Sequence, residues 1–372
     1  MSDQRTSPVR DALIVAGGRG TRLQPLTHDV PKPLLPFCGA PFLEGVIRRL
    51  AAAGVVQIQL VVGADTDPFE ILRPAARAHG VELGMVPEPE PLDTAGGVRS
   101  VADRLDRPFF VLNGDILTDV DYAAVGRRHV DAGADATMVL TEVEDTSSYG
   151  VALRDGTRIV EFLEKPDPAS FSGPGAINAG TYVLEPHVLL AHPPGRLSFE
   201  RDVFPGLLER GDVVEGVVWD GVWADLGTPG RYRAGHRLAL SGALRWPPLD
   251  DVPARVDGLR IAPDADVDPG ANVVAPVLIL GGSQVESGAT VGPGTVLGRD
   301  VRVGRGAALE GAVLHDRVDV GDGVAAPGLV AGHGARVEAG ARMGRDVVLG
   351  SAEVVGGAET VRDGASRPHP QD

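Results

Sequence analysis

The sequence predicts an α/β domain followed by a parallel β-helix. Between residues 11 and 245, apolar strand-like runs alternate with helix-like segments, which is the pattern of α/β folds. From residue 255 to 360, an apolar residue recurs at every sixth position, a repeat typical of parallel β-helices. The length of 372 residues fits two such domains, and we expect flexible ends at 1–10 and 361–372.

Composition excludes two broad classes of function. The formal net charge of −16 argues against binding to nucleic acid or to anionic surfaces in general. Residues 1–10 are polar and lack the apolar segment of a secretory signal, and no run of about 20 apolar residues is present. Cys38 is the single cysteine, so no intramolecular disulfide can form. We therefore expect a cytoplasmic protein with neither a membrane nor a nucleic-acid partner.

The first strand and the loop after it predict a phosphate site. An apolar run at 12–16 predicts a buried strand, and glycines follow at 17, 18 and 20. Glycines let the backbone approach a ligand closely, and consecutive N–H groups bind anions. Arg19, Arg22 and Lys32 add positive charge. The combination favours a polyphosphate ligand, although the spacing fits neither a P-loop nor a dinucleotide-binding loop.

Lysine usage supports two of the predicted phosphate contacts. Of 35 basic residues, only Lys32 and Lys165 are lysines, and all others are arginines. Lysine is a compact point charge, whereas arginine is a planar fork, so a site that cannot accommodate the fork resists replacement. Both lysines lie within candidate phosphate-site segments, which favours a functional reading of both.

The other elements of the α/β domain follow from apolar spacing, helix caps and glycine breaks. Strands are expected at 58–63, 81–86, 108–112, 136–143 and 219–223, with a hairpin turn at Asp155-Gly156. Helices are expected at 41–53, 67–79, 121–132 and 229–240, and shorter ones end near 105 and 211.

Asn113-Gly114-Asp115 directly follows the strand expected at 108–112. An aspartate at the carboxyl end of a parallel strand lies in the crevice where such sheets bind ligands. Its hard carboxylate oxygens suit Mg²⁺ on a triphosphate. Taken alone, the motif favours a turn aspartate after Asn-Gly, and a magnesium ligand is the functional interpretation.

The C-terminal repeat has nine consecutive apolar positions, each followed four residues later by a small or β-branched residue. These positions are Ile261, Val267, Val273, Ile279, Val285, Val291, Leu297, Val303 and Leu309. The register slips after Val313, resumes at Ala331 and ends near Val361. Turns rich in glycine and proline separate the repeats, as a β-helix requires.

The segment from Leu13 to Thr27, together with Pro31-Lys32-Pro33, resembles the signature of sugar-1-phosphate nucleotidyltransferases. The segment 198–205 and the C-terminal tail, which contains one type of repeat, look most like those of mannose-1-phosphate guanylyltransferases with a hexapeptide-repeat tail. The resemblance covers nearly the whole chain. It implies that the α/β domain is a nucleotidyltransferase domain with a Rossmann-like mixed sheet and that the β-helix is left-handed.

The resemblance also implies roles for individual residues. The catalytic residues would be Arg22, Lys32, Asp115 and Lys165, and the Mg²⁺ ligands would be Asp115 and Asp225. The nucleotide would be bound by Ala16, Gly17, Gly18, Gly20, Thr21, Arg22, Thr94, Ala95, Gly96, Asn113 and Gly114. The sugar phosphate would be bound by Tyr149, Gly150, Glu164, Lys165 and Asn178. Asp93 stands where the resembled family usually has glycine.

The implied reaction joins a nucleoside triphosphate to a sugar 1-phosphate and releases pyrophosphate. A phosphate oxygen of the sugar attacks the α-phosphorus in line, so catalysis consists of positioning and charge neutralisation. The best match is GTP with mannose 1-phosphate or a related sugar or cyclitol phosphate. Uridylyl or thymidylyl transfer to glucose 1-phosphate is the alternative.

Two readings of another class stay open. The repeat also occurs in hexapeptide acyltransferases, for which His315 and His333 would be the candidate bases. A non-catalytic regulatory subunit of the same fold would be expected to lack the catalytic residues, which this chain retains. We expect the tail to serve in homo-oligomer formation and in closing the core.

Overall fold

The computed structural model describes residues 6–167, 171–256 and 258–368, and it divides into two compact units. The sheet unit consists of Met1–Gly18 and Val46–Trp223, and the β-helix unit consists of Arg19–Gly45 and Ala224–Asp372. The sequence predicts one break between residues 245 and 255. Instead, the segments 19–45 and 224–250 group with the β-helix, and each unit is described by itself below.

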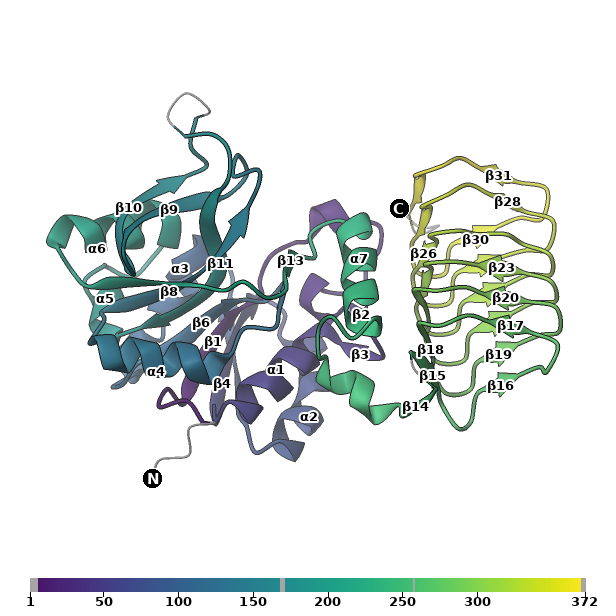
Figure 1. Cartoon of the computed structure of the whole chain (residues 1–372), viewed down its shortest axis with the longest axis horizontal. Helices are drawn as coiled ribbons and strands as arrows, with labels where there is room; N and C mark the ends of the chain where they lie inside the picture. The colour runs from purple at the N-terminus through teal and green to yellow at the C-terminus, as the bar shows by residue number, and fades with distance from the viewer. Residues whose placement is uncertain (1–5, 168–170, 257, 369–372) are drawn as a thin grey trace. The chain divides into compact units, whose positions relative to one another are not determined.

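The sheet unit contains a nine-stranded mixed sheet in the order β5-β4-β1-β6-β11-β8-β12-β10-β9 (Figure 1). The strands β5, β4, β1 and β6 are parallel, and β11 is antiparallel to both of its main neighbours, β6 and β8. The strands are β1 (Asp11–Val15), β4 (Gln57–Gly63), β5 (Glu82–Glu88), β6 (Phe109–Asn113), β8 (Ala136–Val143), β9 (Gly150–Asp155), β10 (Arg158–Glu164), β11 (Gly175–Leu184) and β12 (Val214–Val218). Two shorter strands are β7 (Ile116–Thr118) and β13 (Trp223–Asp225).

Helices connect these strands, and most of them begin or end at a residue that the sequence marks. Asp121 caps α4 by accepting a hydrogen bond from the Ala124 N–H, and Gly133 ends this helix in a left-handed conformation. The helices are α1 (Phe42–Ala52), α2 (Arg73–Ala78), α3 (Asp93–Arg99), α4 (Tyr122–Ala132), α5 (Pro186–Leu190) and α6 (Phe204–Arg210). Short 3₁₀ helices lie at Asp67–Leu72 and Ala102–Arg104, and a π-helical turn at Phe199–Val203 precedes α6.

The β-helix unit contains short parallel strands that stack coil upon coil, consistent with a left-handed β-helix (Figure 1). Its first sheet comprises β14 (Ala254–Val256), β15 (Leu259–Ile261), β18 (Val277–Ile279), β21 (Thr295–Leu297), β24 (Val313–Leu314), β26 (Val330–Ala331), β29 (Val348–Leu349) and β32 (Ser366–Arg367). Its second comprises β16 (Asp266–Val267), β19 (Gln284–Val285), β22 (Arg302–Val303), β25 (Asp319–Val320), β27 (Arg336–Val337) and β30 (Val354–Val355). The third side holds β17 (Asn272–Val273), β20 (Thr290–Val291), β23 (Ala308–Leu309), β28 (Arg342–Met343) and β31 (Thr360–Val361).

The predicted slip in the repeat has a structural cause. Val277 pairs with Thr295, a step of 18 residues, whereas Val296 pairs with Val313, a step of 17. One corner is therefore a residue short, and Leu314 rather than Val313 joins the internal core that also contains Leu309. Val313 faces the opposite side of its strand, yet it too is buried. The repeat thus predicts the coil, and the shortened corner explains why the sixfold spacing fails there.

The first sheet of the β-helix is apolar on both faces. Leu278, Val296, Val313 and Val330 are stacked in register and are buried although they lie outside the internal core. Other parts of the same unit lie against the coils, including the hairpin of β2 (Pro36–Phe37) and β3 (Ala40–Pro41), and α7 (Pro229–Leu240). Short 3₁₀ helices at Thr21–Leu23, Lys32–Leu34 and Pro247–Asp251 complete the unit.

Several boundaries differ from the sequence predictions. The helix expected at 67–79 is a 3₁₀ helix followed by α2, because Pro74 cannot donate the backbone hydrogen bond that a continuous α-helix needs there. Residues 219–222 are a bend between β12 and β13 and do not form the expected strand.

The two ends also differ from the expectation of flexible tails. Ser7 and Val9 are buried, and the Ser7 N–H donates to the Ala53 carbonyl. At the other end, β32 pairs with β29, so the coil continues to residue 367. The rest of both predicted tails, 1–5 and 369–372, lies outside the described residues.

A cluster of rings fixes the hairpin against α7. Phe37 contacts His236, Tyr232 and Trp246, with ring centroids 4.4, 6.4 and 5.1 Å away, and Phe42 stacks on Trp246. The Cys38 Sγ atom lies 3.4 Å from His236 Nδ1. Burial lowers the pKa of His236 to about 3, so this imidazole is neutral in the folded chain.

The buried His236 predicts acid sensitivity with a defined sign. In the unfolded chain a histidine binds a proton below a pH of about 6.5, whereas folded His236 does not until about pH 3. Stability therefore falls on acidification across this window, by about 1.4 kcal/mol per pH unit from this group. Urea unfolding between pH 7.5 and 4.5 measures the slope for the wild type and for His236→Phe. The substitution should make the slope shallower, and equal slopes would contradict the assignment.

Candidate active site

The carboxyl ends of β1 and β6 bring together the first group of predicted nucleotide contacts. Val15 pairs with Asn113, and the Gly114 N–H donates to the Val15 carbonyl at 2.8 Å. A Cβ at Gly114 would lie 2.8 Å from that carbonyl oxygen, so only glycine fits. Ala16 continues from β1 and donates to the Val61 carbonyl. The two loops therefore adjoin in the structure, and Asp115 is the next residue along the chain.

Glu88 is a residue that sequence reasoning missed. It ends β5, and its carboxylate lies close to Gly17, a predicted nucleotide contact, and to Gly97, which follows the predicted contact Gly96. A Cβ at Gly17 would be 3.3 Å from Oε2, and one at Gly97 would be 2.3 Å from Oε1. The Oε1 atom is buried and accepts no hydrogen bond of good geometry from the described residues. Burial raises the pKa of Glu88, opposed by the nearby Gly97 N–H. Its place at the carboxyl end of a parallel strand is the signal that could have found it.

The first turn of α3 is bonded to the segment 195–203. The Ala95 N–H donates to the Leu197 carbonyl, and the Leu197 N–H donates to the Leu92 carbonyl. Thr94 Oγ1 donates to Glu200 Oε2 at 2.7 Å and accepts from the Phe199 N–H at 2.9 Å. The Thr94 hydroxyl is therefore a structural link in this state, and the segment that resembles guanylyltransferases supports the loop that resembles a base-binding loop.

Asp93 has a defined conformation and two charged partners. Its φ of 68° is left-handed, which is the conformation that the usual glycine adopts without strain. Its Oδ1 accepts from the Thr94 N–H at 3.0 Å, and its Oδ2 accepts from Arg201 Nη2 and, at 3.4 Å, from Arg196 Nε. The carboxylate thus ties the two segments together a second time.

The predicted sugar-phosphate residues lie on β9, β10 and β11 of the sheet unit or directly next to these strands. The Lys165 N–H donates to the Tyr149 carbonyl, and Lys165 Nζ lies 3.2 Å from Glu164 Oε1. A Cβ at Gly150 would lie 2.9 Å from Glu164 Oε2, so glycine leaves room for this carboxylate. The Tyr149 ring packs edge-on against the Trp223 ring.

Asn178 is held by its own strand neighbours. Its Oδ1 accepts from the Gly180 N–H at 2.9 Å, and its Nδ2 donates to the Tyr182 hydroxyl at 2.7 Å. Gly180 has a φ of 70°, and a Cβ there would lie 2.7 Å from Asn113 Nδ2. The predicted sugar contact therefore adjoins the predicted nucleotide contact Asn113 within the sheet unit.

The β-helix unit carries the remaining predicted residues. Gly20 has a φ of 61°, and its carbonyl accepts from Thr27 Oγ1 and from the Leu23 N–H, which closes the 3₁₀ turn containing Thr21 and Arg22. A Cβ at Gly20 would lie 2.9 Å from the Cβ of Lys32, so this glycine permits a close approach of the two segments.

Asp225 is the centre of charge in this unit. Three cations face its carboxylate: Arg231 Nη1 at 2.9 Å, Lys32 Nζ at 3.6 Å and Arg22 Nη2 at 3.8 Å. The side chains of Asp225 and Lys32 are 13% and 9% exposed, so this pair is largely shielded from water, whereas Arg22 is 66% exposed. Arg22 is therefore free to reach a ligand, and Lys32 is held in place.

The donor set fits a magnesium ion that arrives with a phosphate ligand. Asp225 Oδ1 is buried and has no hydrogen-bond partner among the described residues. The same part of the chain contains no group of three or more histidine, cysteine, aspartate or glutamate residues arranged to hold a metal. Mg²⁺ needs no such cage, since it commonly binds through one or two carboxylates, phosphate oxygens and water.

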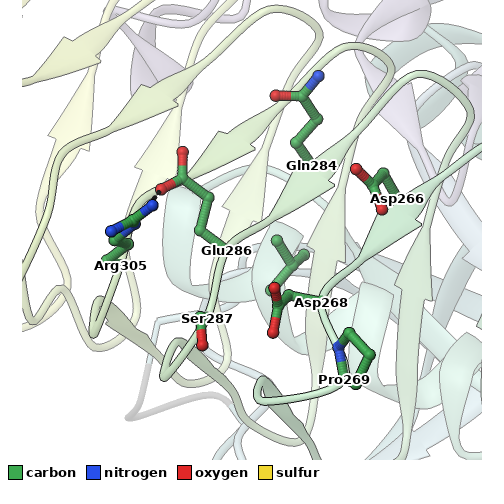
Figure 2. Close-up of a pocket in the computed structure, with 8 residues that line it drawn as sticks. Asp266, Asp268, Pro269, Gln284, Glu286, Ser287 and Arg305 are labelled. Atoms are coloured by element: carbon green, nitrogen blue, oxygen red, sulfur yellow. Dashed lines mark ion pairs between the residues drawn. The ribbon is translucent and has the colours of Figure 1, made fainter.

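A polar hollow of about 300 Å³ lies on the β-helix, away from these residues in the sequence (Figure 2). Arg305 Nε lies 3.6 Å from Glu286 Oε2, and Asp266, Asp268 and Gln284 line the rest. Because its carboxylates outnumber its single arginine, the hollow does not suit a phosphate. We therefore assign it no part in the predicted reaction.

The family model described as nucleotidyl transferase matches residues 11–241. The chain belongs to the nucleotidyl transferase family. Curated relatives extend the match across the tail: a mannose-1-phosphate guanylyltransferase of Mycobacterium tuberculosis is 38% identical over 316 residues, covering 83% of this chain and 81% of the relative. A probable mannose-1-phosphate guanylyltransferase 1 of Oryza sativa subsp. japonica is 33% identical over 340 residues, covering 88% and 89%. This nucleotidyl transferase is accordingly a sugar-1-phosphate nucleotidyltransferase.

Solved structures match the α/β part of the nucleotidyl transferase. HddC from Yersinia pseudotuberculosis complexed with GMP-PN is 29% identical with a TM-score of 0.51, and the match covers 61% of this chain and 98% of that one. A putative glucose-1-phosphate thymidylyltransferase from Bacillus anthracis, 23% identical with a TM-score of 0.57 over 62% of this chain and 95% of that one, shares the fold. Within the described residues, no helix has both the length and the apolar character needed to cross a membrane.

The left-handed conformation of Asp93 yields a stability prediction. Asp93→Ala and Asp93→Gly both remove the carboxylate, but only glycine adopts a φ near 68° without strain. The alanine variant should be less stable than the glycine variant by about 1 kcal/mol. Urea unfolding of the two variants measures this difference directly. Equal stability would show that position 93 relaxes out of the left-handed region.

Proposed function

We propose that this enzyme transfers GMP from GTP to mannose 1-phosphate, or to a related sugar or cyclitol phosphate, and releases pyrophosphate. The names of the curated relatives support this substrate pair, and so does the GMP-PN ligand named for HddC. The hydrogen bonds between the segment 198–205, which resembles guanylyltransferases, and the first turn of α3, which contains predicted nucleotide contacts, further support this choice.

The observation that carries the choice of base is the buried carboxylate of Glu88. Guanine presents two neighbouring donors, N1–H and the N2 amino group, to an acceptor in its plane. A carboxylate with an unpaired oxygen can accept both. Uracil and thymine present one N–H between two carbonyl oxygens, and those oxygens would repel the same carboxylate. Glu88 lies beside Gly17 and Gly97, on either side of the predicted nucleotide loop, where it can exert this preference.

The chemistry proposed for the sugar phosphate needs no base, since its phosphate is already an anion. Lys165 binds this phosphate, and Glu164 and Asn178 bind sugar hydroxyls. Exposed Arg22 binds the departing pyrophosphate, and Lys32 neutralises charge at the transferring phosphoryl group. Asp115 and Asp225 would supply carboxylates for Mg²⁺, which would offset the negative charge of the reacting phosphates. Placing cations where negative charge accumulates accounts for the rate enhancement.

The competing readings find less support in the geometry. His315 is buried against Tyr232, so it is not exposed as the base of an acyltransferase. A regulatory subunit would not need the arrangement of Lys32, Arg22 and Arg231 around Asp225. Uridylyl or thymidylyl transfer to glucose 1-phosphate remains the alternative within the family. Homo-oligomer formation through the β-helix stays a prediction.

Pyrophosphate release tests the proposed function. The enzyme is supplied with MgCl₂, each of GTP, UTP, dTTP, ATP and CTP, and either mannose 1-phosphate or glucose 1-phosphate, followed by cyclitol phosphates. Fastest release with GTP and mannose 1-phosphate or a related phosphate is expected. Fastest release with UTP or dTTP would overturn the choice of base. Full turnover in both Asp115→Asn and Lys165→Ala would overturn the assignment of the site.

Glu88→Gln tests the base contact. The variant replaces one acceptor oxygen by an amide NH₂ group, which can only donate, so it should lower kcat/KM for GTP by about tenfold or more and reduce the preference for GTP over UTP. Steady-state kinetics with the two nucleotides measure the ratio. Glu90→Gln, an exposed neighbour, is the matched control and should keep the wild-type ratio. An unchanged ratio in Glu88→Gln would remove Glu88 from base recognition.

A further inference from the structure

One tyrosine, Tyr232, contacts both segments of the β-helix unit that carry predicted catalytic or metal-binding residues. These are the segment containing Lys32 and the segment containing Asp225. Tyr232 lies in the first turns of α7, and its hydroxyl donates to the carbonyl oxygen of Pro36, which follows the segment containing Lys32. The same hydroxyl oxygen lies 3.2 Å from Nε2 of His315, which belongs to a coil of the β-helix. Tyr232 is 1% exposed and His315 is 2% exposed, so water cannot substitute for either partner.

The direction of these hydrogen bonds follows from the number of protons. Burial raises the pKa of Tyr232 well above 10 and lowers that of His315 well below 6.5, so the tyrosine keeps its proton and the imidazole is neutral. A hydroxyl has one proton, which Tyr232 gives to the Pro36 carbonyl. The His315 nitrogen must then donate to the tyrosine oxygen, which fixes the Nε2–H tautomer. The result is a chain of two hydrogen bonds from His315 through Tyr232 to Pro36.

The backbone between Lys32 and Pro36 is rigid, so the position of the Pro36 carbonyl restricts the position of Lys32. Prolines at 31, 33 and 36 fix three φ angles within six residues. The Leu35 N–H donates to the Lys32 carbonyl, and the Phe42 N–H donates to the Leu35 carbonyl. Holding Pro36 therefore holds the backbone of Lys32, whose Nζ lies 3.6 Å from Asp225 Oδ1.

The backbone of Tyr232 controls the other segment. Its N–H donates to the carbonyl of Thr228, the residue that caps α7 by accepting from the Arg231 N–H. Thr228 follows Asp225 by three residues, and Arg231 Nη1 bonds to Asp225 Oδ2 at 2.9 Å. A shift of Tyr232 would thus displace both members of the Lys32–Asp225 pair.

We infer that Tyr232 and His315 are positioning residues for nucleotidyl transfer, through which a coil of the β-helix sets the places of Lys32 and Asp225. The inference rests on the proposed roles of these two residues in the reaction. It gives the tail a direct part in turnover, beyond closing the core or joining subunits. Neither Tyr232 nor His315 touches substrate in this scheme.

The test compares full-length variants that alter the hydrogen bonds and keep the packing. Tyr232→Phe retains the ring and deletes the hydroxyl, and His315→Leu deletes the donor. Each should lower kcat by about tenfold at 25 °C, while KM for the nucleotide stays within about twofold, because a small misplacement acts on the transition state. The double variant should be no slower than either single variant, since both break one chain of bonds.

Two further variants separate positioning from general stability. His315→Gln can still donate an N–H toward Tyr232 and should recover most of the lost kcat. Tyr122→Phe removes the hydroxyl of another buried tyrosine, in the sheet unit, and should keep the wild-type kcat. Lower thermal stability with unchanged kcat in Tyr232→Phe and His315→Leu would overturn the inference, and so would an equal loss in His315→Gln and His315→Leu.

A measurement that does not depend on turnover tests the inference separately from the proposed function. Hydrogen exchange at the amides of residues 34, 35 and 42 should be faster in Tyr232→Phe than in the wild type, and slow exchange in both would overturn the inference. The kinetic comparison uses whichever nucleotide and sugar phosphate the wild type turns over fastest. If GTP and mannose 1-phosphate are not that pair, the proposed substrates fail while the positioning test still applies.

Discussion

The contact on which the functional part of the β-helix unit depends is the shielded pair of Lys32 and Asp225. A carboxylate and an ammonium with little exposure to water are costly to bury, and each is tolerated because the other is present. Arg231 adds a second partner to the carboxylate, and the glycines at 20 and 227 let the three segments approach closely. The pair thereby fixes the relative places of the loop before α1 and the residues that lead into α7.

This arrangement also shows how an acidic protein can concentrate positive charge in one place. The net charge of −16 is spread over the chain, whereas Arg22, Lys32 and Arg231 gather around one carboxylate. Arg22 is the most exposed of the three and the farthest from Asp225. An incoming anion can therefore recruit Arg22 without breaking the buried pair, so the site is built before its ligand arrives.

Much of the fold could be predicted from the sequence because its signals are local. The sixfold apolar spacing predicts the coil, Asp121 predicts the start of α4, and the glycine-rich loop after β1 predicts a close backbone approach of the kind seen at Gly20. Glu88 could not be found in this way, since its importance depends on two glycines, at 17 and 97, that only the sheet brings beside it. The division into units could not be predicted from the sequence either, because residues 19–45 join the β-helix through contacts between residues far apart in the chain.

The first sheet of the β-helix, which is apolar on both faces, has a consequence for how the protein can evolve. Leu278, Val296, Val313 and Val330 are buried outside the internal core, and His315 is a hydrogen-bond partner of the Tyr232 hydroxyl, which in turn donates to the Pro36 carbonyl. A descendant that lost the tail would expose the parts of the hairpin and of α7 that lie against these coils, and would leave the tyrosine oxygen without its donor. The tail could therefore be shed only after the hairpin and α7 had acquired a polar surface.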